Sequence, residues 1–469
     1  MSTTAFEPPL RPSHWPIKVA RNTVDPRGVT ETLLPHRAQD VGADAITGDT
    51  AVRARRGRTA AWALTVMILA FAVYLASPVR LETDSFWVVY TARSLVAHQD
   101  ADLDEYHQII RRGTGFQVES HNGHSYYEAP LATSLAAVPF VAVASMFEGD
   151  ALDHRLADGH AQPLDGIIAA ALAAVTTGVM FLVLNRLTRR RWIALVCTGT
   201  FALGTQVWST ASRTMWMHGP SLLCLALALL LALRVRRAGE WCAALGATLA
   251  LAYFVRPTNV VPLLVIGAWM CWNGRRQALR FASGAASVVA VFAVLNVVLY
   301  GRLLQPYFRA SRIGVSATTV EALLGNLVSP ARGLFVFVPV SLVCGYGFLL
   351  KRQAGTLSSL DLAVAASAVG YWLLVSTFPS WWAGWSYGPR FLTDIAPMLI
   401  WFLPPVLESI ADRRRVALAA LVVAVLAFSV AVQARGALDQ STAEWNWKPT
   451  DVGIDRARLW DWTDPQFLR

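Results

Sequence analysis

The chain has 469 residues, of which 55% are hydrophobic and only 15% are charged, with a formal net charge of +10. A soluble domain is nearer a quarter charged, so this composition excludes an ordinary soluble globular protein. The positive charge does not indicate nucleic acid binding, because the basic residues cluster in short loops between apolar segments, as membrane topology requires.

The N-terminal residues, 1–59, are polar, carry several prolines and end in the basic run Arg53 to Arg58. This composition predicts a disordered cytoplasmic tail. The first apolar run, Ala60 to Ala76, starts too late for an ordinary signal peptide, so we expect an uncleaved membrane anchor.

Further apolar segments follow, most of them of roughly the length that crosses the hydrocarbon layer as a helix. One additional stretch, 131–147, either crosses the membrane or lies at its interface. The predicted spans are about 60–77, 165–185, 192–209, 220–234, 241–255, 259–273, 281–300, 334–350, 358–377, 393–409 and 416–433.

The basic clusters decide between the two topologies, because arginine and lysine favour cytoplasmic loops. If 131–147 does not cross, every cluster faces the cytoplasm; if it crosses, all but the first face outward. The sequence therefore predicts an all-α integral protein of the inner or plasma membrane, with about eleven transmembrane helices and a cytoplasmic N-terminus. Its membrane domain covers 60–433, a long first outer loop with interfacial helices covers about 78–164, and a short outer tail covers 434–469.

Acidic residues of the first outer loop are candidates for general base chemistry. Asp84 lies just beyond the first span, at the water boundary where a carboxylate stays ionised. An acceptor hydroxyl needs such a base to become a nucleophile. Glu82, Asp104 and Glu128 are further candidates in the same loop. The alternative is that these acids are solvated loop residues or helix caps.

Isolated outer arginines run against the positive-inside bias and could grip a lipid phosphate through their planar fork. Arg256 and Arg390 are the main candidates, and Arg332, beside a helix start, is a weaker one. The alternatives are snorkelling to head groups or, for Arg390, pairing with Asp394 on the next helical turn.

His218 lies at the same level of the outer face and could contact the phosphate or act as an acid. Tyr387 and its neighbours Trp381, Trp382 and Trp385 could stack on sugar faces. An interfacial aromatic belt is the favoured interpretation for most of these rings.

With these segments in order, the chain from about residue 60 resembles lipid-linked-sugar glycosyltransferases of the GT-C superfamily. It is most similar to bacterial relatives of protein O-mannosyltransferases and aminoarabinose transferases. The resemblance lies in Glu82-Thr83-Asp84, Tyr126-Tyr127-Glu128-Ala129-Pro130, Trp216-Met217-His218-Gly219-Pro220, Arg256-Pro257-Thr258, Ser329-Pro330-Ala331-Arg332-Gly333, Trp385-Ser386-Tyr387-Gly388-Pro389-Arg390 and Trp460-Asp461-Trp462. The family usually has a double proline where this chain has Ala129-Pro130, and many members carry a larger outer domain.

The resemblance implies a periplasmic or extracellular active site that uses a polyprenyl-phosphate sugar as donor. Asp84 would be the catalytic base, and Arg390, Arg256 and Tyr387 would lie at the donor phosphate. The acceptor would be a glycan, lipid or protein. No cofactor is expected, although Glu82, Asp84 and Glu128 could form a weak divalent metal site, as in some superfamily members.

Two other functions stay open. A flippase of lipid-linked sugars needs a hydrophilic path across the bilayer, whereas the predicted spans contain almost no ionisable residues. A ligase would instead transfer a whole glycan from a pyrophosphate carrier.

Overall fold

The computed structural model describes residues 40–80, 84–114, 116–235, 239–308, 314–315, 317–413 and 415–469. The chain divides into two units, residues 1–57 and 58–469. In the first unit, the described residues form the start of helix α1 (Asp40–Ala76). The predicted disordered tail is therefore helical from Asp40, in a stretch that is rich in the helix formers Ala and Arg and free of proline.

The second unit is helical apart from one short β-hairpin among the described residues, which confirms the predicted all-α class. Strands β1 (Val118–His121) and β2 (His124–Tyr127) pair antiparallel, with Val118 opposite Tyr127. The helices after α1 are α2 (Val88–Ala97), α3 (His107–Ile109), α4 (Leu131–Glu148), α5 (Asp150–Ala157), α6 (Gln162–Leu187), α7 (Arg191–Leu203), α8 (His218–Val235), α9 (Cys242–Val255), α10 (Val260–Asn273), α11 (Arg275–Tyr300), α12 (Thr319–Val328), α13 (Leu334–Phe337), α14 (Val340–Gln353), α15 (Ser359–Val375), α16 (Ala396–Ile400), α17 (Pro404–Arg413), α18 (Val416–Leu438) and α19 (Ser441–Glu444).

Several of these helices are long and apolar enough to cross a membrane, so the prediction of a membrane protein is confirmed. Six meet this condition among the described residues: Gly57–Ala76 of α1, α4, α6, α8, α11 and α18. The broken pair Arg390–Ile400 and Pro404–Arg413, bent by 44°, makes a seventh if it counts as one span. Each predicted span coincides with a helix or a broken helix, but several helices are shorter, so the count of about eleven crossings stays a prediction.

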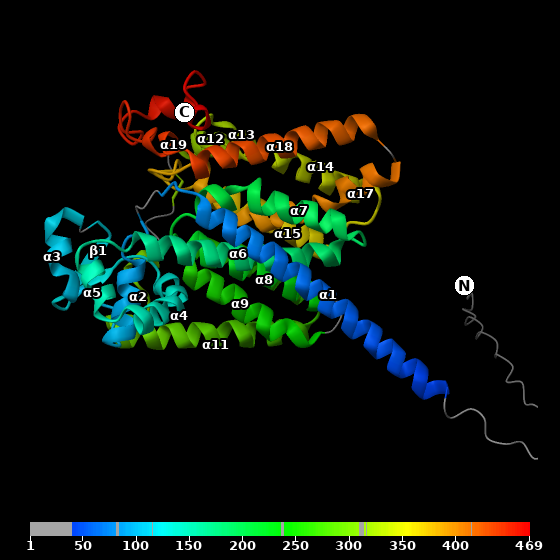
Figure 1. Cartoon of the computed structure of the whole chain (residues 1–469), viewed down its shortest axis with the longest axis horizontal. Helices are drawn as coiled ribbons and strands as arrows, with labels where there is room; N and C mark the ends of the chain where they lie inside the picture. The colour runs from blue at the N-terminus through cyan, green and yellow to red at the C-terminus, as the bar shows by residue number, and fades with distance from the viewer. Residues whose placement is uncertain are drawn as a thin grey trace, which may run out of the picture. The chain divides into compact units, whose positions relative to one another are not determined.

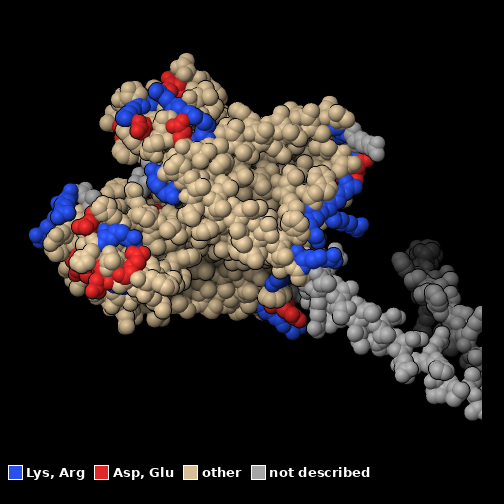
Figure 2. Space-filling model, in the orientation of Figure 1, with Lys and Arg blue, Asp and Glu red and all other residues tan. Residues whose placement is uncertain are grey.

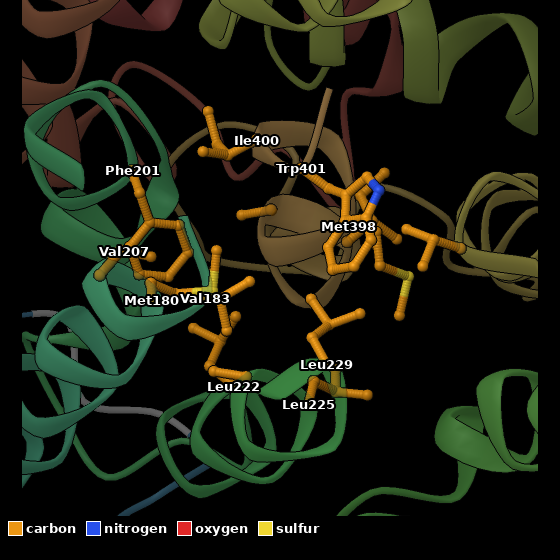
Figure 3. Close-up of a cluster of buried hydrophobic side chains, with 14 of the residues drawn as sticks. Met180, Val183, Phe201, Val207, Leu222, Leu225, Leu229, Met398, Ile400 and Trp401 are labelled. Carbon is orange, nitrogen blue, oxygen red and sulfur yellow. The ribbon is translucent and has the colours of Figure 1, made fainter. Parts of the chain in front are cut away.

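Helix α6 packs against both α7 and α8, α8 packs against α9, and α9 lies along α11 (Figure 1). Glycines make the last contact close: a Cβ on Gly246 would lie 2.0 Å from the Phe281 carbonyl oxygen, and one on Gly284 would lie 1.9 Å from that of Ala243. Small residues of this kind let membrane helices approach backbone to backbone. Figure 3 shows the core beside them, where α6, α7, α8 and α16 turn apolar side chains toward one another.

Charged side chains gather at two opposite ends of the visible face of the second unit, with a broad uncharged band between them (Figure 2). One end, called the basic end here, carries the turn between α6 and α7, where Thr188 donates to Glu408 at 2.6 Å and Arg190 contacts Asp412 at 2.6 Å. The other end, called the site end, holds the close of α1, the start of α6 and the start of α8. An uncharged band between two charged ends is typical of a protein that spans a membrane.

Helix α4 begins and ends at the site end. At its start, the Leu131 backbone N–H donates to Gln305 Oε1 at 3.0 Å, just beyond α11. At its close, Ser145 Oγ accepts from Arg93 of α2 at 3.1 Å. Helix α4 is also long and apolar enough to span, so the interfacial assignment of 131–147 stays a prediction.

Candidate active site

Asp84 and Arg390, which lie 306 residues apart in the sequence, form an ion pair at the site end. Arg390 Nη2 donates to Asp84 Oδ2 at 2.7 Å. The Asp84 side chain is 26% exposed, whereas that of Arg390 is 7% exposed. The carboxylate is thus open to a bound molecule while the guanidinium beneath it is shielded from water.

The turn that carries Asp84 is held by aromatic residues on both sides. Trp87, which leads into α2, is fully buried, and its indole N–H donates to the Phe116 carbonyl at 3.1 Å. Tyr127, the last residue of β2, donates its phenol hydrogen to the Asp84 carbonyl oxygen. The hairpin therefore positions the backbone of Asp84, which the sequence did not reveal.

Arg390 begins the 3-10 helix Arg390–Ile395, directly after a tight turn. Gly388 has a φ of +59°, and a Cβ there would meet the Phe337 ring at 2.6 Å, so only glycine fits. The Arg390 guanidinium carbon lies 4.6 Å from the centre of the Trp216 ring, a stacked cation–π contact. Trp216 is 4% exposed and was not among the predicted site residues.

A second, fully buried ionic network surrounds Asp394. Its Oδ2 accepts from His218 Nδ1 at 2.6 Å and from Arg256 Nη1, and its Oδ1 accepts from Ser221 Oγ. Asn259 in turn donates to Ser221 Oγ at 2.8 Å. The carboxylate holds one imidazole nitrogen, so it fixes the orientation of His218.

The proposed pairing of Arg390 with Asp394 is wrong, and the reason is the local helix type. Residues four apart share a face in an α-helix. In the 3-10 helix Arg390–Ile395, with about three residues per turn, they do not. Asp394 therefore faces Arg256 and His218, and Arg390 faces Asp84.

The buried network is recessed from the outermost residues of the site end. Arg256 sits at the apex between α9 and α10, each of which has 14 residues and so is roughly 21 Å long. Helix α11, which packs along α9, has 26 residues and reaches roughly 39 Å. The shorter pair leaves its charged apex below the level that α11 reaches, so ionised groups lie inside the protein rather than on its surface.

Glu128 and Asp104, the other predicted acids within the described residues, lie beside strand β2. Glu128 lines a pocket with Glu119, His121, Tyr126, Tyr127, Tyr300 and Arg302. Asp104 Oδ2 lies 2.7 Å from His124 Nδ1, and its Oδ1 accepts from the Ser125 backbone N–H at 2.9 Å. The hydrogen bond to Asp104 raises the pKa of His124 above its ordinary value. Glu82, the remaining acid, lies outside the described residues.

Arg332 is 1% exposed, and all five of its N–H groups donate within the protein. The acceptors are the carbonyls of Ala331, Trp382 and Gly384 and the side chains of Gln466 and Asn446. No N–H is left for an anion, so Arg332 joins the 381–390 loop to the tail.

Aromatic residues of that loop are mostly buried, which corrects the expectation of an exposed belt. Trp381, Trp382 and Tyr387 are each at most 5% exposed, and only Trp385, at 40%, is open. The Tyr387 hydroxyl donates to the Val432 carbonyl at 2.5 Å, so it braces α18 rather than facing a ligand.

Two groups of side chains could hold a divalent cation, both in the first outer loop. One is Asp102, Asp104 and His124, and the other is Asp100, Asp102 and Glu105. Within the described part of the chain, neither Asp84 nor Glu128 belongs to such a group, so the weak metal site predicted at these acids gains no support.

No protein-family model, no curated protein and no solved structure matches the chain. An accessible carboxylate can accept a proton, and a shielded guanidinium can hold an oxyanion. The two groups are in direct contact.

Proposed function

We propose that the chain is a membrane glycosyltransferase similar to the GT-C superfamily. It would move a monosaccharide from a polyprenyl-phosphate donor to a hydroxyl of a cell-envelope glycan, lipid or protein. The observation that carries this proposal is the contact between Asp84 and Arg390. This contact places a proton acceptor beside a group that can stabilise an oxyanion. Transfer of a sugar with phosphate as the leaving group needs both.

In the proposed reaction, Asp84 accepts the proton of the acceptor hydroxyl. The acceptor oxygen bonds to the anomeric carbon, and the bond between that carbon and the phosphate oxygen breaks. The electron pair leaves with the polyprenyl phosphate, whose charge Arg390 stabilises. Arg390 rather than Arg256 takes this role, because Arg256 is already held by the fully buried carboxylate of Asp394.

The buried network of His218, Arg256 and Asp394 is assigned to positioning. It closes the floor beneath the reacting groups and keeps the imidazole in one orientation. His218 stays a candidate for proton transfer to the leaving phosphate.

A flippase of lipid-linked sugars fits these features less well. The described charged residues collect at the two ends, and the space between α6, α7, α8 and α16 is filled by apolar side chains (Figure 3). A lipid-bound sugar would need a hydrophilic path through this core. A glycan ligase has no specific feature in its favour.

The test is transfer by the purified protein in liposomes that contain a polyprenyl-phosphate sugar. Arg390→Lys should lower transfer about ten- to a hundred-fold, because an ammonium cannot replace a planar fork that contributes roughly 1.5–3 kcal/mol through one charged hydrogen bond. Arg93→Lys is the matched control, since Arg93 also binds a carboxylate, Asp153, at 2.7 Å but in the outer loop.

Full activity of Arg390→Lys would remove Arg390 from the donor site. If the unaltered protein translocates the lipid-linked sugar without transferring it, the protein is a flippase. If it transfers an intact glycan block from a pyrophosphate carrier, it is a ligase.

The proposed topology has about eleven crossings, a cytoplasmic basic end and a periplasmic or extracellular site end. In a variant without the five native cysteines, new cysteines at the exposed positions Asp150 and Gln440 should react with an impermeant reagent from outside. A cysteine at Arg275 should not. Protection of Asp150 and Gln440 together with labelling of Arg275 would show that α4 crosses and would overturn this topology.

A further inference from the structure

Two buried hydrogen-bond donors at the site lack a partner within the described residues: Arg390 Nε and Trp216 Nε1. Both side chains are more than nine-tenths buried. A buried donor that makes no hydrogen bond is costly and is rare in native structures, so each one calls for a reason.

The two donors belong to one place. The Arg390 guanidinium carbon stacks 4.6 Å from the centre of the Trp216 ring. Other buried indoles of the chain have acceptors for their N–H groups: those of Trp87, Trp208, Trp401 and Trp445. Among the described tryptophans, Trp216 is the one whose indole nitrogen is fully buried without an acceptor.

The contact between Arg390 and Asp84 uses the guanidinium only in part. Asp84 takes a single hydrogen bond, from Nη2. In contrast, Asp153 binds Arg93 through both Nε and Nη2, each at 2.7 Å. A two-point grip is usual for arginine and a carboxylate, so Asp84 leaves one side of the Arg390 fork unused.

We propose that Trp216 is a ligand-binding residue, and that its indole N–H and the Arg390 Nε–H together hold the phosphate of the lipid donor. This rests on the proposed function. In the sugar donor the phosphate is a diester with two terminal oxygens, and once the sugar has left, the polyprenyl phosphate is a monoester with three. Terminal oxygens around a tetrahedral phosphorus point in different directions, so they can accept from Nη2, Nε and an indole N–H at once. A planar carboxylate in the position of Asp84 reaches only Nη2. Phosphate binding thereby satisfies both lone donors and releases the Asp84 carboxylate for the acceptor.

The test measures the affinity of the protein, in phosphatidylcholine nanodiscs, for a polyprenyl phosphate and for the matching uncharged polyprenol. The unaltered protein should bind the phosphate more tightly. Trp216→Phe, which keeps an aromatic ring for Arg390 but removes the N–H, should weaken phosphate binding about ten- to a hundred-fold and leave polyprenol binding unchanged.

The matched control is Trp269→Phe, which also removes one indole N–H, here donated to Ser359 Oγ at 3.1 Å, far from Asp84. It should bind both lipids like the unaltered protein. If Trp216→Phe does not fold, replacing Trp216 by benzothienylalanine removes the N–H without changing the shape of the ring and should give the same loss.

Equal phosphate affinity of either Trp216 variant and the unaltered protein would overturn the role of Trp216 and leave the proposed function standing. Failure of the unaltered protein to distinguish the phosphate from the polyprenol would instead remove the basis of both proposals. Displacement of the polyprenyl phosphate by phosphatidylglycerol would show that the two donors bind bilayer head groups, which would also overturn the assignment.

Discussion

Replacing Asp84 by asparagine should move donor binding and sugar transfer in opposite directions. The side chains have nearly the same shape, but asparagine is neutral and cannot take the acceptor's proton. Loss of the base should lower transfer by at least about a hundred-fold. Loss of the carboxylate also frees Arg390, so polyprenyl phosphate no longer competes with an internal anion.

The gain in affinity can be sized from the contact itself. Arg390 donates to Asp84 at 2.7 Å, a charge-assisted hydrogen bond of a type that contributes roughly 1.5–3 kcal/mol. The Asp84 side chain is 26% exposed, so solvent screens part of this value. About 1–2 kcal/mol remains, which corresponds to roughly five- to thirty-fold tighter binding of polyprenyl phosphate.

The assay compares lipid phosphate affinity in nanodiscs with transfer in a single turnover, for the same preparation. Asp153→Asn, which removes a carboxylate from Arg93 in the same outer loop, is the control and should change neither quantity strongly. If Asp84→Asn binds the lipid phosphate more weakly than the unaltered protein, then Asp84 does not compete for Arg390. If transfer persists at the normal rate, Asp84 is not the base.

Two further predictions concern stability. Arg332→Lys should lose at least two of five buried hydrogen bonds and so lower the free energy of unfolding by roughly 2–6 kcal/mol. Residues 439–469 should then become sensitive to protease. The exposed Arg456→Lys is the control, and an unchanged melting temperature of Arg332→Lys would contradict the role of Arg332. Because the hydrogen bond to Asp104 raises the pKa of His124, their contact should hold the outer loop below about pH 6.5 and weaken as pH rises through the folded value. Hydrogen exchange of the hairpin should therefore speed up with pH beyond its intrinsic dependence, and His124→Asn should abolish this excess; an equal excess in the variant would show another cause.

Hydropathy predicted the positions of the helices well, because a helix that crosses hydrocarbon needs a long uninterrupted apolar segment. Each predicted span coincides with a helix or a broken helix. The interfacial assignment of 131–147 came from charge bias alone and stays a prediction, because α4 is also long and apolar enough to span. Helix lengths were less predictable, since apolar runs do not reveal breaks such as the one between α16 and α17.

Residue type singled out Asp84, Arg256 and Arg390, but it did not predict how their side chains pair. Outer arginines stood out against the positive-inside bias, yet hydropathy cannot say that Arg390 meets Asp84 while Arg256 meets Asp394. Which carboxylate each arginine contacts depends on the 3-10 helix Arg390–Ile395, and no local sequence pattern predicted that helix. The burial of Arg332 and of the aromatic residues in the 381–390 loop was not predicted, because the tail covers them. Packing of the tail on this loop leaves no periodic pattern in the sequence.

The tail, residues 439–469, also determines the order of events during synthesis and folding of the protein. Gln466 accepts from the Gly388 backbone N–H at 3.1 Å and donates to the Ser386 carbonyl at 2.8 Å, so it shapes the loop that carries Arg390. A ribosome makes this loop well before it reaches residue 466. The helices can therefore enter the membrane and pack while the loop still lacks its brace. The loop that carries Arg390 gains this brace only when residue 466 has emerged and folded back, so a nascent chain stalled before that point would be inserted with the loop still unbraced.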